Sequence, residues 1–338
     1  MQPAAQPSSS HAHLWVLTDH VVGHTSQSLG VAEALGLPFE QRELAYGSLA
    51  ALPWSLGARS LAGLTAESRQ KLAPPWPRLV IAAGRRLGAV ARWIKRRAAR
   101  DGRSTRLVQI MDPVAARDAF DLIAAPRHDA MTPGPTVIET LGAPNRITQA
   151  RLSEEASRWR DRLADLPSPR FALLVGGATR HHGFAPAVAA ELGRLASDLA
   201  RSAGGGLLIT TSRRTGAAAT EALIDAVRAP SFVHRWDAGG GDNPYFAFLG
   251  LCDAAIVTGE SISMCSEACA TGRPVYIFAP PSIIKPAFAA FHAQLYQSGM
   301  AQPLDQSTTR AFTPWFYPPL SAAEEVAAAI RARGLLSS

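Results

Sequence analysis

Cysteine is scarce in this chain of 338 residues, which holds Cys252, Cys265 and Cys269 only. Three cysteines at uneven spacing are too few for a disulfide framework, and they match no pattern of zinc ligands. A reducing compartment is therefore the default expectation.

Long apolar runs are missing as well. None approaches the ~18 residues that a membrane span needs. The first ten residues, MQPAAQPSSS, lack both the basic region and the apolar core of a signal peptide. We expect a disordered tail over residues 1–12.

Several motifs of nucleotide and hydrolase chemistry are also absent. No G-x-G-x-x-G follows an apolar run, and no G-x-x-x-x-G-K-[ST] phosphate loop occurs. No G-x-S-x-G nucleophile elbow and no D-x-D pair that would hold a metal ion on a diphosphate occurs either. We expect no metal site and no bound cofactor.

What the chain does contain is apolar and basic. Hydrophobic residues make up 47% and charged residues 18%, which excludes a disordered chain, and the length favours two domains. The net charge of +7 is concentrated in residues 1–150, with 17 Lys and Arg against 11 Asp and Glu; residues 151–338 hold 17 against 16.

The segment from Arg85 to Arg106 carries nine of these cations and one acid, Asp101. It also carries apolar residues such as Trp93, so it predicts a cationic helix that attracts an anionic membrane surface, at about 1 kcal/mol per cation. The alternative is a solvated helix face partly paired with Asp101. Aromatic residues are sparse there, so we do not expect nucleic acid as a partner.

Short apolar runs alternate with amphipathic stretches along the chain. Most runs are continuously apolar, which is typical of strands buried on both faces of a parallel sheet. We predict strands over residues 13–18, 78–83, 105–110, 120–125, 136–140, 170–175, 206–211, 231–236, 253–258 and 273–278. We predict helices near residues 26–36, 86–101, 151–166, 185–203, 215–228, 244–251, 262–271, 285–298 and 322–333.

This alternation predicts an α/β protein with two doubly wound Rossmann-like domains that face a cleft. The N-terminal α/β domain covers residues 13–150 and a linker helix covers residues 151–169. The C-terminal α/β domain covers residues 170–310, and a crossing segment with a last helix covers residues 311–338.

Polar residues gather where the predicted strands end, and ligands of open α/β sheets bind beyond the carboxyl ends of strands. In the second half these loops suit a diphosphate. Glycines allow close backbone approach, arginines pair with phosphate oxygens, and the amides that open a helix attract anions. The candidates are Gly176, Gly177, Arg180, Ser212, Arg213, Arg214, Asn243, Tyr245, Glu260, Ser261, Ser263 and Glu267.

Several of these residues have a plainer interpretation. The glycine pair is then only a tight turn, and Arg213 and Arg214 a solvated helix start. Ser263 is then only an N-cap, and Glu267 an acid that complements a helix dipole. Polar residues follow the strands of the first half too, and the candidates there are Gln27, Arg85, Asp112 and His128.

Some of these stretches, in this order, resemble the bacterial branch of the "elongated mitochondria" family, named for a plant mitochondrial-fission factor. They are LVIAAGRR at 79–86, FDLIAAPRHD at 120–129, LLITTSRR at 207–214 and TGESISMCSEACATGRPVY at 258–276. The first polar loop departs from the family, because Gly23-His24-Thr25-Ser26-Gln27 stands where the family usually has a Gly-Asn-Gln-type turn.

The resemblance implies a glycosyltransferase B-type architecture, with a nucleotide-diphospho-sugar donor on the second domain and the acceptor on the first. The segment around Ser266-Glu267-Ala268 is similar to the donor helix of lipid-linked peptidoglycan glycosyltransferases. That similarity implies that Glu267 holds the ribose, and we favour a UDP-type donor. It also implies a protein of the bacterial cytoplasm, able to attach to the inner membrane.

A transferase without a metal pair must meet the charge of the departing diphosphate with arginines and helix amides. Arg213, Arg214, Ser261 and Ser263 are the candidates, and the base is His24 or Asp19. We therefore predict a metal-independent glycosyltransferase with a cell-envelope or lipid-linked acceptor. The alternatives are a nucleotide-sugar epimerase or hydrolase on the same fold, or a non-catalytic scaffold at a membrane.

Overall fold

The computed structural model describes residues 13–47, 61, 63–129, 131–132, 134–237 and 241–336. The tail predicted over residues 1–12 lies outside these residues. The chain divides into two compact units. Unit 1 comprises residues 1–140, 144–146 and 323–338, and unit 2 comprises residues 141–143 and 147–322.

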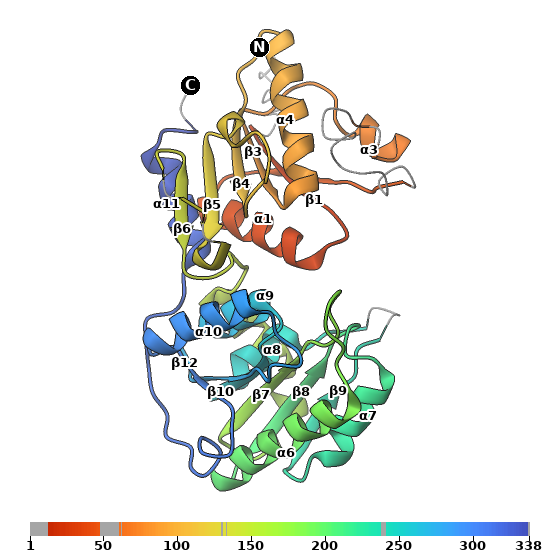
Figure 1. Ribbon diagram of the computed structural model, residues 1–338, viewed down its shortest axis with the longest axis vertical. Coiled ribbons are helices and arrows are strands. Elements are labelled where there is room, and N and C mark those ends of the chain that lie inside the picture. The colour runs from red at the N-terminus through yellow and green to blue at the C-terminus, as the bar shows by residue number, and fades with distance from the viewer. Residues whose placement is uncertain are drawn as a thin grey trace, which may run out of the picture. The chain divides into compact units, whose positions relative to one another are not determined.

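Unit 1 is built on a parallel sheet of six strands in the order β2-β1-β3-β4-β5-β6 (Figure 1). The strands are β1 Leu14–Thr18, β2 Glu40–Glu43, β3 Leu79–Ala83, β4 Arg106–Ile110, β5 Leu122–Pro126 and β6 Val137–Thr140. The helices are α1 Val22–Leu35, α3 Ala66–Gln70, α4 Arg85–Arg100 and α11 Ala322–Ala332.

Side chains of β1 alternate between two apolar layers, because successive residues of a strand point to opposite faces of the sheet. Leu14 and Val16 lie in the cluster that includes α1 and α11. Trp15 and Leu17 lie in the cluster that includes α4. The strand is buried on both faces, which explains its unbroken apolar sequence.

Unit 2 is built on a second parallel sheet of six strands, in the order β12-β11-β10-β7-β8-β9. The strands are β7 Arg170–Val175, β8 Gly206–Thr211, β9 Ser231–His234, β10 Ala254–Thr258, β11 Val275–Phe278 and β12 Ala301–Pro303. The helices are α5 Gln149–Trp159, α6 Pro186–Ser202, α7 Ala217–Ala226, α8 Tyr245–Leu251, α9 Ile262–Cys269 and α10 Pro286–Gln297.

The prediction of two doubly wound α/β domains is confirmed, and all ten predicted strands are present. Two edge strands were not predicted. β2 has the polar sequence EQRE and lies at the edge of its sheet, where one side of the strand has no partner in the described residues. β12 is three residues long.

The predicted helix over residues 151–166 begins at Gln149 and ends at Trp159, and a 3-10 turn over Asp161–Leu163 follows it. Leu152, Trp159 and Leu163 lie in the apolar core of unit 2 together with β7 and β10. This segment is therefore a packed part of unit 2.

The last helix returns to the N-terminal unit. Val326, Ala327 and Ile330 of α11 are fully buried in the same cluster as Leu14 of β1. Arg331 adds a hydrogen bond from its guanidinium to the Ala34 carbonyl at 2.7 Å. No helix in the described part of the chain has the length and apolar character needed to cross a membrane.

Candidate functional site

Two loops of unit 2 meet where its strand order reverses. β7 and β10 are neighbours in the sheet, while the chain runs from β7 toward β8 on one side and from β10 toward β11 on the other. Open α/β sheets bind ligands at this switch point, outside the carboxyl ends of the strands. The loops there begin with Gly176 after β7 and Gly259 after β10.

The glycine pair is needed for contacts within the protein. A Cβ on Gly176 would lie 1.8 Å from Glu260 Oε1, and a Cβ on Gly177 would lie 2.2 Å from the Arg214 carbonyl oxygen. Both amides are already bonded: Gly176 N–H donates to Thr258 Oγ1 at 2.8 Å and Gly177 N–H donates to Glu260 Oε1 at 2.7 Å. These glycines make room for neighbouring loops, and their approach to a diphosphate stays a prediction.

Arg214 is a predicted cation that contacts the loop after β10 at this switch point. Its Nη2 lies 3.4 Å from Glu260 Oε1, and its side chain is 37% exposed, so it can still meet a ligand. Helix α7 begins at Ala217, so Arg213 and Arg214 precede the helix and do not start it. Arg213 and Arg180 are exposed.

Ser212 has a structural contact. Its Oγ donates to the Gly176 carbonyl at 2.7 Å, which ties the loop after β8 to the loop after β7. His292 does the same for the loop after β10, since its buried ring places Nε2 2.9 Å from the Gly259 carbonyl oxygen. These hydrogen bonds hold the three loops together next to Glu260.

Helix α9 starts directly after this loop. Ser261 is its N-cap and accepts a hydrogen bond from the Met264 amide at 3.4 Å, so the interpretation of Ser263 as the N-cap is wrong. The described helix has no acidic residue in its first turn, which leaves its positive end available to an anion.

Glu267 of α9 and Tyr245 of α8 form a hydrogen-bonded pair. Tyr245 Oη donates to Glu267 Oε2 at 2.5 Å, and burial together with the Glu267 charge raises the pKa of Tyr245 well above its usual range. Asn243 Oδ1 accepts the Tyr245 amide at 3.1 Å, and Pro244 occupies the N-cap of α8 where we predicted the first helical position. The structure thus brings three predicted residues together and fixes the Glu267 carboxylate.

A second cluster lies in unit 1, around a cavity of about 330 Å³. It brings together three predicted residues, His24, Arg85 and Asp112, and its full lining is His24, Gly84, Arg85, Met111, Asp112, Val114 and Asp129. Gln27 is buried in α1 and His128 lies beside Asp129; neither is among these lining residues.

His24 lies in the first turn of α1, which begins at Val22, and not in the predicted loop. Its Nδ1 is 3.6 Å from Asp19 Oδ1. Burial raises the pKa of Asp19, but the contacts with His24 and the Val21 amide outweigh it, so the pKa lies below its usual range. The ionised carboxylate of Asp19 therefore lies next to the imidazole of His24.

Because Gly84 has no side chain, the imidazole of His24 can lie close to its backbone. A Cβ there would lie 2.7 Å from His24 Cε1, and the backbone has a φ of +80°. Asp112 is held by Arg117, whose Nη2 lies 2.6 Å from its Oδ2, and this contact lowers the pKa of Asp112. Asp112 therefore lines the cavity as an ionised carboxylate that Arg117 holds in place.

Asp129 is a lining residue that the sequence analysis missed. Burial raises the pKa of its carboxyl group, and burial lowers the pKa of the neighbouring His128, whose Nε2 lies 3.7 Å from Asp129 Oδ1. The signal in the sequence was the polar loop after β5, but it does not tell which of its side chains faces the cavity.

The loop after β4 is strained where it lines this cavity. Met111, Val114 and Ala116 have φ angles of 70°, 67° and 50°, a region that residues other than glycine rarely occupy. Such strain is common at binding sites, where the surrounding structure holds it in place.

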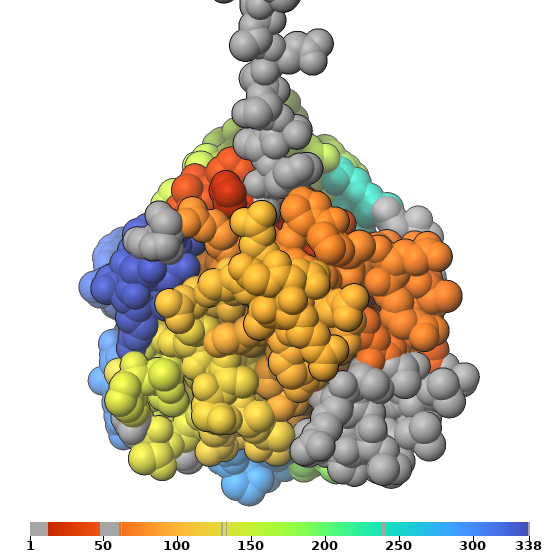
Figure 2. Space-filling view, turned by 90° about the horizontal axis from the view of Figure 1, so that it is seen from above, coloured from red at the N-terminus to blue at the C-terminus, as the bar shows by residue number. Residues whose placement is uncertain are grey.

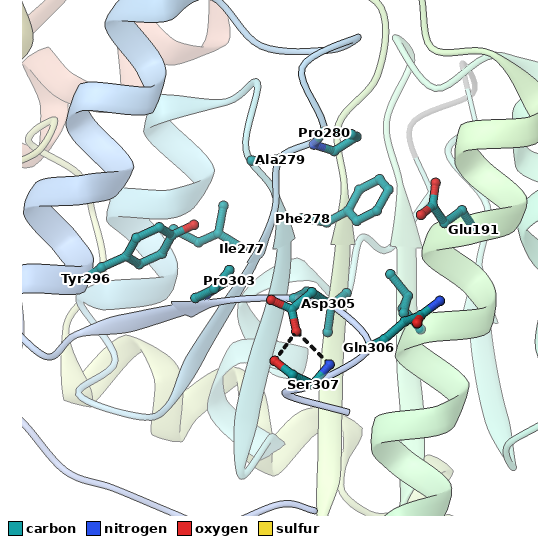
Figure 3. A pocket seen from close by; sticks show the side chains of 12 residues that line it. Glu191, Ile277, Phe278, Ala279, Pro280, Tyr296, Pro303, Asp305, Gln306 and Ser307 are labelled. Carbon is teal, nitrogen blue, oxygen red and sulfur yellow. Dashed lines mark hydrogen bonds between the residues drawn. The ribbon is translucent and has the colours of Figure 1, made fainter. Parts of the chain in front are cut away.

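Another cavity, of about 630 Å³, lies elsewhere in unit 2 (Figure 3). Its walls come from α6, α10 and the residues after β11 and β12, with Phe278, Tyr296 and Asp305 among them (Figure 3). None of the predicted site residues lines it. Within the described residues no group of His, Cys, Asp and Glu could hold a metal ion.

Comparison with known sequences gives one family. The model described as mitochondrial fission ELM1 matches residues 22–334. The mitochondrial fission protein ELM1 of Arabidopsis thaliana is 30% identical over 292 residues, which cover 80% of this chain and 66% of that protein. This chain therefore spans slightly less than two thirds of its length. The uncharacterized protein RP120 of Rickettsia prowazekii is 27% identical over 352 residues, covering 94% of this chain and 98% of that protein.

Comparison with solved structures gives sugar-nucleotide enzymes. The UDP-GlcNAc 2-epimerase of Methanocaldococcus jannaschii in complex with UDP-GlcNAc and UDP has a TM-score of 0.54 at 11% identity, covering 94% of this chain and 99% of that one. The spinosyn forosaminyltransferase SpnP has a TM-score of 0.54 at 13% identity, covering 97% and 96%. At such identities the likeness shows the fold alone, which is the predicted glycosyltransferase B type.

Proposed function

This chain belongs to the mitochondrial fission ELM1 family, and from that premise we propose that it is a metal-independent glycosyltransferase with a nucleotide-diphospho-sugar donor on unit 2. The acceptor is a cell-envelope or lipid-linked hydroxyl compound bound in the cavity of unit 1. The observation that carries the proposal is the arrangement at the switch point of unit 2. There Arg214 lies 3.4 Å from Glu260 in the loop that precedes α9, the start of α9 offers positive charge, and Tyr245 fixes the carboxylate of Glu267 on the same helix.

Each part of that arrangement has a counterpart in the donor. Arg214 pairs with phosphate oxygens. The backbone N–H groups that open α9 stabilise the negative charge that develops on the leaving diphosphate. The Glu267 carboxylate accepts hydrogen bonds from ribose hydroxyls. A UDP-type donor is supported by the M. jannaschii structure of the same fold, which is described in complex with UDP-GlcNAc and UDP.

The cavity of unit 1 supplies the other half of the reaction. His24 takes the proton from the acceptor hydroxyl, and the ionised Asp19 orients its ring and stabilises the charge it gains. Arg85, Asp112 and Asp129 provide charged and hydrogen-bonding groups around the acceptor.

The first test is binding. UDP at a hundredfold excess over its Kd should stabilise the protein by about 2.7 kcal/mol, which thermal unfolding detects as a higher Tm. Arg214→Ala should abolish this increase. Arg194→Ala, which removes an exposed arginine of α6 well apart in sequence from the predicted loops, should keep it. If none of the common nucleoside diphosphates raises the Tm, the proposal fails.

Turnover separates the candidate functions. A transferase releases UDP from its sugar donor only when an acceptor such as a bacterial lipid extract is present. An epimerase or hydrolase consumes the donor when no acceptor is present. The likeness to an epimerase favours this second candidate. A protein that binds UDP and consumes no donor under either condition is a scaffold, the candidate that the family's link to mitochondrial fission favours.

We also propose that unit 1 attaches to an anionic membrane surface through the outer face of α4. Arg96, Arg97 and Arg100 are exposed on this face. Figure 2 shows unit 1 from the side on which the orange and yellow segments lie, and α4 is one of these segments. The apolar residues of α4 point inward, with Leu87, Val90, Ala91 and Ile94 buried. The attraction is therefore electrostatic.

Part of the cationic segment has other partners. Lys95 and Arg106 both pair with Asp121, at 2.8 and 3.0 Å. Asp101, which the alternative interpretation paired with this segment, accepts a hydrogen bond from Trp76 Nε1 at 2.7 Å.

Changing Arg96, Arg97 and Arg100 together to Gln should weaken binding to phosphatidylserine vesicles about 100-fold, since three charges contribute about 1 kcal/mol each. Vesicle co-sedimentation measures the effect. The matched control is Arg194→Gln with Arg201→Gln, which removes exposed arginines of α6 and should change little. Equal binding by the α4 variant, or wild-type binding that resists high salt, would contradict the proposal.

A further inference from the structure

Glu260 is a carboxyl group without access to water. Its side chain is 0% exposed, in the loop between β10 and α9. Oε1 accepts the Gly177 amide at 2.7 Å. Oε2 has no hydrogen-bond partner among the residues that the structure describes.

One cation faces this carboxyl group in the described part of the chain. Arg214 Nη2 lies 3.4 Å from Oε1 and comes from the loop after β8. The loop after β7 contributes only backbone, at Gly176 and Gly177. From α10, His292 contacts the adjacent Gly259 carbonyl, and from α9 the buried Cys265 thiol lies close enough that the Glu260 charge helps to raise its pKa.

Arg214 is also the proposed ligand of the donor phosphates. When a diphosphate binds to Arg214, the guanidinium charge is shared with it, and further negative charge comes close to a carboxylate that is fully buried. A buried carboxylate with a shared counter-ion is costly, and the usual relief is neutralisation by a proton.

The fold already disfavours the charged form of Glu260 in the free protein. Burial raises the pKa of Glu260 above its usual range, and the Gly177 amide, the Thr258 side chain and Arg214 offset only part of that effect. Protonation at Oε2 leaves Oε1 as the acceptor for Gly177 N–H, so the loops stay connected. Protonation at Oε2 also removes the buried negative charge from a carboxyl group whose second oxygen has no partner among the described residues.

We propose that Glu260 takes up one proton from solvent when a diphosphate binds to Arg214, so that donor binding on unit 2 is coupled to protonation of this buried carboxyl group. The inference rests on the proposed donor site. Glu260 then acts as a positioning residue. Its carboxyl group holds Gly177 and Arg214, and its protonation state changes when the ligand binds. Donor affinity then rises as pH falls, by at most about tenfold per pH unit for one proton.

The test is isothermal titration calorimetry with UDP-GlcNAc, whose diphosphate diester has no group that titrates near neutral pH. Titrations at several pH values, each in two buffers with different ionisation enthalpies, give the number of protons taken up. We expect an uptake of up to one proton for the wild type. Glu260→Gln keeps an oxygen for the Gly177 amide but cannot be protonated, so it should bind with no uptake and with an affinity independent of pH.

The controls are His181→Gln and His182→Gln in the neighbouring loop, which should retain the uptake. If Glu260→Gln does not fold, infrared difference spectra of the wild type replace it, because the C=O band of a protonated carboxylic acid should appear when UDP-GlcNAc is added. Absence of that band, binding without proton uptake, or uptake that persists in Glu260→Gln overturns the inference while the donor site stands. Absence of binding at every pH overturns both.

Discussion

Replacing Gly177 with alanine is expected to destabilise the protein by roughly 3 kcal/mol or more. The new Cβ would lie 2.2 Å from the Arg214 carbonyl oxygen and 2.4 Å from the Thr215 amide nitrogen. Both are backbone atoms of the loop after β8, so no side-chain rotation relieves the contact. The φ of +151° adds strain for any residue with a side chain.

Thermal and urea unfolding measure this effect, and Gly183→Ala is the matched control. Gly183 lies in the same loop, and a Cβ there would meet nothing within 4 Å. Its replacement should change the free energy of unfolding by less than about 1 kcal/mol. Equal stability of the two variants would mean that the loops after β7 and β8 do not approach each other as described.

Replacing Glu267 with glutamine is expected to lower the affinity for UDP by about 10- to 100-fold, the effect of losing a charged hydrogen-bond acceptor for ribose hydroxyls. Titration calorimetry measures it. The structure supports the position of the carboxylate, since Tyr245 Oη holds Oε2 at 2.5 Å. Tyr245→Phe removes that bond and keeps the carboxylate, so its loss of affinity should be smaller.

A ligand without ribose hydroxyls isolates the contact. With 2′,3′-dideoxy-UDP, wild type and Glu267→Gln should bind equally, because the contact is already missing in both complexes. If Glu267→Gln weakens both nucleotides by the same factor, the carboxylate supports the fold of α9 and does not contact the ribose.

Hydrophobic patterning predicted the buried elements of this fold and missed those at its edges. β7 and β8 were predicted with their observed bounds, because a strand buried on both faces is apolar throughout. β2 was missed because Glu40 to Glu43 alternates between exposed and half-buried positions at a sheet edge. The start of α1 was placed late because Val21, its N-cap, has no side-chain oxygen that marks a helix start.

The loops of the site could be predicted, but the contacts of their side chains could not. Polar residues at strand ends correctly indicated Arg214 and Glu260 as neighbours of one edge. Nothing in the sequence shows that Glu260 is fully buried or that its oxygen holds the Gly177 amide. The left-handed backbone of Met111 and Val114 has no sequence signal either, since glycine or asparagine would be expected there.

The helix α11 has a consequence for how the chain is made. One face of strands β1 and β3 packs against Val326, Ala327 and Ile330 of α11. The ribosome adds these residues only after the whole of unit 2. Helix α1 covers part of this face, but the face is completed only after unit 2 has been synthesised. All six strands of the unit 2 sheet are made before α11, so that sheet can form before the sheet of unit 1 is fully covered.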